Sequence, residues 1–188
     1  MSTLRLVLAL ACLGVACPGS GEGGADRGPG LGLHASNTDV ARVFWTIFPD
    51  GENLPPGSGT AAEGRRLFQL HCQSCHGPEG SGKPADRLAG GQGTLASEMP
   101  VKTVGSYWPY ATTVFNYIRR AMPYTAPMSL SNDDYYALTA YLLQLNEIIG
   151  VDQTINAETL PKVIMPNREG FVLSYPKRPP RYDYRTDQ

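Results

Sequence analysis

The stretch Cys72-Gln73-Ser74-Cys75-His76 decides how this sequence of 188 residues is to be interpreted. Two cysteines separated by two residues and followed at once by a histidine form the attachment signature of a c-type haem. The thiols of Cys72 and Cys75 are expected to bond the porphyrin, and His76 is expected to ligate the iron. A zinc site would need a second Cys/His pair at ligand spacing, and a thioredoxin-like dithiol would need a βαβ setting. Neither is found, so the motif predicts one covalent haem c.

A helix is predicted immediately before the motif. Thr60 and Glu63 have the spacing of a capping box, in which each residue satisfies a backbone N–H of the other. The helix that follows carries Gly64, Phe68 and Cys72 at intervals of four residues, so the three lie on one face. We expect this face to point toward the haem.

Two further helices are predicted after the motif. Apolar residues at helical spacing indicate a helix over 111–121, and Pro123 stops it. Ser131 is the expected N-cap of the other helix, whose apolar stripe runs to about Ile149, and Gly150 is expected to end it.

The second axial position of the iron has several candidate ligands. His34 lies in a glycine-rich segment, and His71 is too close to the motif to reach the opposite haem face. Met122 follows His76 by enough residues for the chain to wrap the haem and return on its distal side, and Met128 in the next loop is the alternative. We therefore predict Met122, with a vacant or different sixth position as the remaining alternative. A thioether ligand would raise the reduction potential and close the iron to substrate, which favours electron transfer over catalysis.

Arg87, Tyr107, Trp108 and Tyr110 are candidate partners of the haem propionates. They lie in segments close to the motif and carry N–H or O–H groups that bind carboxylates. The alternative is ordinary packing, since tyrosine and tryptophan commonly fill cores.

The N-terminus predicts export to the periplasm. Residues 1–17 contain a short apolar core, Leu4–Val15, and small residues at its end, as a signal peptide does. The sequence around Cys17 is similar to a lipoprotein cleavage site, which implies a lipid anchor at Cys17; plain cleavage near Ala16 is the alternative. The net charge of −1 gives no reason to expect a nucleic-acid partner.

Composition divides the rest of the chain into four parts. Residues 18–35 are a glycine-rich tether, 36–59 an N-terminal arm, 60–150 the haem domain and 151–188 an extended, proline-rich arm. The part of this last arm after Tyr175 has the alternative of a frayed tail.

The predicted helices resemble those of the class I cytochrome c family, whose terminal helices cross beside the haem. The residues that carry this resemblance are Gly64, Phe68, Tyr141 and Leu142. It implies an all-α fold of three main helices around a covalent haem, here with extended N- and C-terminal arms. It also places Pro84 where the family has a proline whose carbonyl accepts the imidazole N–H of His76.

A closer resemblance extends beyond the helices, to segments at 54–59, 84–88, 90–95, 104–113, 119–123, 160–161 and 165–171. These segments are similar to the cytochrome subunit of sulfite dehydrogenase and to the haem domain of SoxD proteins. The resemblance implies a molybdenum-cofactor subunit that oxidises a sulfur compound and passes electrons to the haem, and a cytochrome or oxidase that receives them. SoxD proteins typically carry a second haem, whereas this chain has a single C-x-x-C-H motif and fits the one-haem subunit better.

The proline-rich arm is expected to take part in that partnership. We expect Pro161–Tyr175 to dock on the haem domain and to help form the surface for the molybdenum subunit. Removal of everything after Gly150 is expected to leave haem attachment intact.

Two other functions remain open at this stage. A stand-alone periplasmic shuttle would have no use for the long arm. A haem enzyme such as a peroxidase or a thiosulfate dehydrogenase would need an exchangeable sixth position or a cysteine ligand, for which Cys17 alone remains.

Overall fold

The computed structural model describes residues 46–172 together with His34, Ser36 and Thr38. The chain divides into two units, Met1–Ala41 and Arg42–Gln188, and the description below concerns the second. The predicted signal peptide, Cys17 and nearly all of the tether lie outside the described residues, as does the chain after residue 172. Within the described part, no helix is long and apolar enough to span a bilayer.

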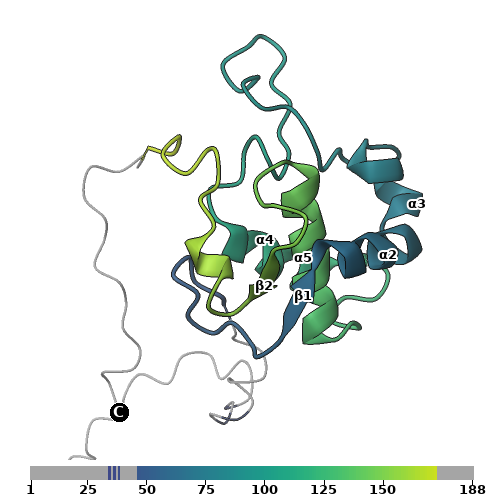
Figure 1. Cartoon of the computed structure of the whole chain (residues 1–188), viewed down its shortest axis with the longest axis vertical. Coiled ribbons are helices and arrows are strands. Elements are labelled where there is room, and N and C mark those ends of the chain that lie inside the picture. Colours follow the sequence, from purple (N-terminus) through teal and green to yellow (C-terminus); the bar gives the residue numbers. More distant parts are fainter. Residues whose placement is uncertain (1–33, 35, 37, 39–45, 173–188) are drawn as a thin grey trace, which may run out of the picture. The chain divides into compact units, whose positions relative to one another are not determined.

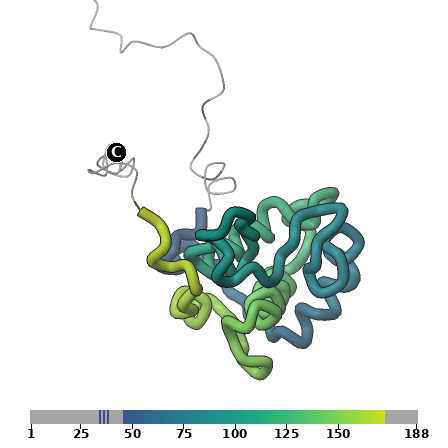
Figure 2. The backbone as a smooth tube through the Cα atoms, turned by 90° about the horizontal axis from the view of Figure 1, so that it is seen from above, coloured from purple at the N-terminus to yellow at the C-terminus, as the bar shows by residue number. Residues whose placement is uncertain are grey.

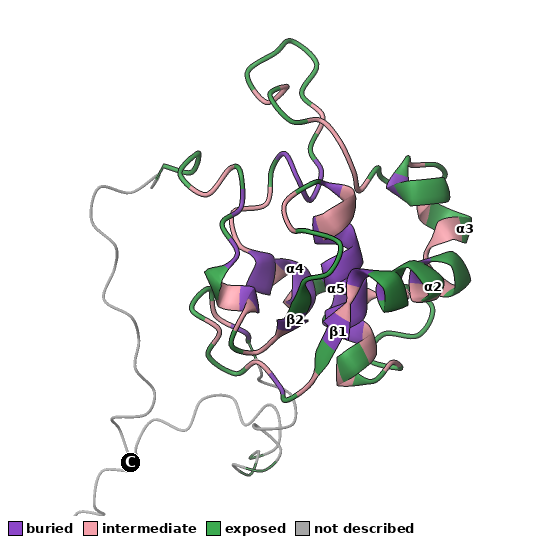
Figure 3. Ribbon diagram, in the orientation of Figure 1, coloured by how far each residue is buried: buried purple, intermediate pink, exposed green. Residues whose placement is uncertain are grey.

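Three helices of 11 to 14 residues dominate this unit (Figure 1). In chain order the elements are β1 (Ser58–Thr60), α2 (Ala61–His71), α3 (Gln73–His76), the short 3-10 helix η1 (Pro78–Gly80), α4 (Ala111–Ala121), α5 (Asn132–Leu145), β2 (Thr154–Asn156) and the short 3-10 helix η2 (Leu160–Lys162). Helix α5 contacts both α2 and α4 and is buried along most of its length (Figure 3). The three predicted helices are therefore present, and the described elements add a two-stranded sheet.

Helix α2 begins as predicted. The Thr60 hydroxyl accepts from the Glu63 backbone N–H at 3.4 Å, and the Glu63 carboxylate accepts from the Thr60 backbone N–H at 2.9 Å. This reciprocal pair is a complete capping box.

The crossing of α2 and α5 depends on Gly64. A Cβ atom there would lie 2.5 Å from the Ala137 carbonyl carbon and 2.8 Å from the Tyr141 Cβ, so no larger residue fits. One turn later the rings of Phe68 and Tyr141 pack with centroids 5.3 Å apart. The predicted close crossing is confirmed, but Gly64 faces α5, whereas Phe68 and Cys72 line the cavity described below.

Helix α5 ends earlier than predicted. Its last residue is Leu145, and the Asn146 side chain folds back to donate to the Leu142 carbonyl at 2.8 Å. The left-handed backbone of Glu147 (φ 60°) then turns the chain away. The apolar stripe was misleading because Ile148 and Ile149 pack against the core from an irregular segment.

The segments on either side of the helices are integral to the fold. Strands β1 and β2 pair antiparallel, with Gly59 opposite Ile155. After β2, the chain runs back along the domain (Figure 2) and buries Leu160, Val163 and Met165 in the core. The core therefore extends past the predicted domain boundary at residue 150, and this burial argues against the expectation that the following arm is dispensable for the haem domain.

Candidate cofactor site

An apolar cavity of about 460 Å³ lies beside the C-x-x-C-H motif. Its wall combines the end of α2, α3, the chain at 85–88 and 102–104, helices α4 and α5, and the residues just after α4. Phe68, Val114, Leu138 and Leu142 form much of the apolar surface. The cavity is also lined by the three motif residues expected to bind the haem, Cys72, Cys75 and His76.

The two cysteines lie on the same wall as free thiols. Cys72 caps α2, where its N–H donates to the Phe68 carbonyl at 2.9 Å, and Cys75 follows within α3. Burial, with a smaller contribution from Cys75, raises the pKa of the Cys72 thiol to about 11. This raised pKa reflects the apolar surroundings of the Cys72 side chain.

The imidazole of His76 is oriented by a backbone carbonyl. Its Nδ1 lies 2.8 Å from the Asp86 carbonyl oxygen, and because a carbonyl can only accept, Nδ1 carries the proton. In the neutral imidazole, Nε2 is then the nitrogen left free to ligate a metal. The family resemblance had assigned this role to the Pro84 carbonyl, and that assignment is wrong. Ala85 N–H bonds to the Cys75 carbonyl at 2.9 Å, and the chain presents Asp86 to the ring instead.

Asn146 holds the segment that presents Asp86. Its Nδ2 donates to the Leu88 carbonyl at 3.1 Å, and its Oδ1 accepts from the Gly90 N–H at 3.0 Å. The side chain is 3% exposed, so both bonds are largely shielded from water. The sequence offered no signal for this role, because the partners lie more than 50 residues away.

Met122 and Met128 occupy different surroundings. Met122 follows the last residue of α4, is half-buried and lines the cavity. Met128 is 52% exposed, has a left-handed backbone (φ 60°) and is not among the lining residues. This geometry favours Met122 over Met128 as the second axial ligand. The assignment stays a prediction.

The four predicted propionate partners separate into two pairs. Arg87 and Trp108 line the cavity. Arg87 Nε also donates to the Ser81 carbonyl at 3.2 Å, and the indole of Trp108 packs edge-on against Tyr117. Lys102 and Tyr117 are among the lining residues that the sequence prediction missed.

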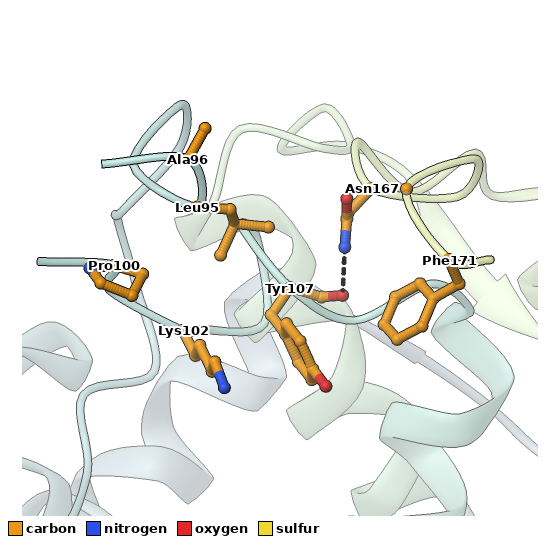
Figure 4. A pocket seen from close by; sticks show the side chains of 8 residues that line it. Leu95, Ala96, Pro100, Lys102, Tyr107, Asn167 and Phe171 are labelled. Carbon is orange, nitrogen blue, oxygen red and sulfur yellow. Dashed lines mark hydrogen bonds between the residues drawn. The ribbon is translucent and has the colours of Figure 1, made fainter. Parts of the chain in front are cut away.

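Tyr107 and Tyr110 do not line this cavity, so their assignment is not supported. Tyr107 lines a second cavity of about 330 Å³ (Figure 4), where its ring packs against Phe171 and its carbonyl accepts from Asn167 Nδ2 at 2.9 Å. The guanidinium of Arg168 lies 4.4 Å from the centre of the Tyr110 ring. Both tyrosines therefore bind the C-terminal segment, which sequence proximity to the motif could not reveal.

Lys102 connects the two cavities, because it lines both. Its Nζ lies 5.1 Å from the centre of the Tyr107 ring, a cation–π contact that positions the side chain (Figure 4). Together with Arg87 it gives the cofactor cavity two cationic groups suited to carboxylates.

This set of residues fits a covalent haem c. It supplies two free thiols, an imidazole with a fixed tautomer, a thioether, an apolar wall and cations. Among the described residues, no group of three or more His, Cys, Asp or Glu side chains could hold a bare metal ion.

Comparison with known proteins defines the class. The family model for cytochrome c matches residues 61–146. The structure is also similar to a chain in the crystal structure of the sulfane dehydrogenase SoxCD from Paracoccus pantotrophus. The identity is 42%, the match covers 84% of this chain and 77% of that one, and the TM-score is 0.71. No curated protein matches by sequence. The chain belongs to the cytochrome c family, and its cofactor is covalent haem c.

Proposed function

We propose that this cytochrome is the electron-transfer subunit of a molybdenum-cofactor dehydrogenase for sulfite or a related sulfur compound. It accepts electrons from the catalytic subunit and passes them to a cytochrome or an oxidase. The observation that carries the proposal is the 42% identity to a chain of a sulfane dehydrogenase over 84% of the sequence. The family model covers only residues 61–146, so this longer match includes segments outside the common cytochrome core.

The residues of the site suit electron transfer better than catalysis at the iron. Bound haem c supplies a one-electron redox centre. Cys72 and Cys75 would hold it, the Asp86 carbonyl keeps the His76 ring in one orientation, and the Met122 thioether would complete the coordination. If His76 and Met122 both ligate the iron, no ligand position would be left for a substrate. The apolar wall would limit water at the haem, and the cations of Arg87 and Lys102 would offset the charge of the haem propionates.

Co-purification tests the proposal. We expect the cytochrome isolated from its native host to carry a second subunit and molybdenum in proportion to its haem. In a stopped-flow experiment, sulfite or another sulfur substrate should reduce the haem only when that subunit is present. The proposal would be wrong if the partner turned over its substrate with an artificial acceptor and left the haem oxidised.

We also propose that the chain is exported and anchored through Cys17. A lipid at this residue, followed by the glycine-rich segment, would hold the haem domain near a membrane. Wild-type protein should sediment with membranes and show the mass of a diacylglyceryl group, and Cys17→Ser should abolish both. Cys12→Ser, a change inside the apolar core, is the matched control and should alter neither. A soluble wild-type protein that begins at Pro18 would contradict the anchor.

A further inference from the structure

The segment 122–130, here called the ligand loop, connects α4 to α5 and carries both candidate methionines. Its six central residues, 124–129, are all exposed. A segment with so few buried contacts has little intrinsic stability, and its position depends on the bonds that hold it.

Two backbone hydrogen bonds hold this loop to α4. The Met122 N–H donates to the Ile118 carbonyl at 2.8 Å, as the last bond of α4. The Met128 N–H donates to the Arg119 carbonyl at 3.1 Å, which folds the middle of the loop back onto the same helix. These are backbone bonds, which a substitution cannot remove cleanly.

A side chain of α5 holds the end of the loop. The Leu130 N–H donates to the Tyr135 hydroxyl oxygen at 3.2 Å. The Tyr135 side chain is 1% exposed and its ring packs edge-on against Phe115, so the hydroxyl has a fixed place. Burial lowers the pKa of the Arg119 guanidinium on α4, and its electrostatic interaction with Tyr135 opposes part of this shift.

We propose that Tyr135 is a positioning residue that latches the ligand loop and thereby keeps Met122 at the cofactor. The inference rests on the assignment of Met122 as axial ligand. Hydrogen bonds hold the loop at Met122, Met128 and Leu130. Leu130 also packs against the core, but its hydrogen bond is made by a single phenol. When that bond is lost, the loop moves away more often, and the thioether moves with it.

Exchange of the axial ligand measures this motion. Added imidazole can replace the thioether of the ferric protein without any change of redox state, but only while the loop is displaced. Its apparent affinity therefore rises with the population of the displaced loop. Loss of one ordinary hydrogen bond should raise that population, and the affinity, by roughly 2- to 10-fold.

Tyr135→Phe and Tyr136→Phe form a matched pair for the test. Both tyrosines are buried on α5 and pack against Phe115, but the Tyr136 hydroxyl donates to the Pro55 carbonyl, outside the ligand loop. Imidazole titration of the two ferric haem proteins should show the increase in affinity in Tyr135→Phe alone. The near-infrared band of methionine-ligated ferric haem should disappear at correspondingly lower imidazole concentration.

The possible results distinguish the proposed role of Tyr135 from the assumption that Met122 is the axial ligand. Suppose the wild-type protein shows the near-infrared band, and wild type and both variants bind imidazole with the same affinity. That result overturns the latch alone. Equal increases in both variants also overturn it, because the effect would then reflect general loosening of α5. A wild-type protein without the band overturns the Met122 assignment and the latch together, and leaves the proposed electron-transfer partnership to its own test.

Discussion

Replacing Met122 by alanine is expected to abolish the near-infrared band of the ferric protein. The reduction potential should fall by on the order of 0.1 V, part of the ~0.8 V range that axial ligands control. The reason is the loss of a soft, neutral ligand that favours ferrous iron. Absorption spectroscopy and redox titration of the purified haem protein measure both effects.

Met128→Ala is the matched control for this change. Met128 is half-exposed and does not line the cofactor cavity, so the band and the potential should stay as in wild type. If Met128→Ala alone removed the band, the axial assignment would pass from Met122 to Met128.

A chain that stops after Gly150 is expected to lose its cooperative fold. The deletion removes Ile155, Leu160, Val163 and Met165, all at most 8% exposed. Each such side chain contributes about 1.5–3 kcal/mol on burial, so their sum rivals the whole stability of an ordinary domain, about 5–15 kcal/mol. Thermal unfolding followed by circular dichroism, together with the yield of haem-loaded protein, tests this expectation.

A chain that stops after Val172 is the control, because it keeps every one of these buried residues. It should unfold at nearly the same temperature as the full chain. A Gly150 truncation with native-like thermal unfolding would show that the core does not need the C-terminal segment.

The parts of the fold that the sequence predicted correctly depend on neighbouring residues. The capping box of Thr60 and Glu63 and the Ser131 N-cap are formed within one turn of helix, and both are present in the structure. Helix α4 has the predicted bounds, because its apolar spacing and the following Pro123 are equally local. The haem motif likewise lies within five consecutive residues.

The errors concern contacts between distant segments. Which carbonyl meets His76 depends on how the chain folds over 77–90, and that fold is held by Asn146 from the end of α5. Tyr107 and Tyr110 lie close to the motif in sequence, yet they pack against the C-terminal segment. The proline-rich composition of that segment predicted an arm outside the haem domain. Prolines exclude regular structure, but they do not exclude burial in a core.

The pairing of β1 with β2 has a consequence for the order of folding. Ser58 and Asn156 are partners in this sheet, so the pair joins the segment just before α2 to the segment after α5. Contacts between residues so far apart along the chain require the loss of loop-closure entropy before they stabilise the fold. Such contacts generally form late in folding. The helices can approach one another through shorter connections. The segment that follows α5 therefore determines when the core closes around the haem-binding segment.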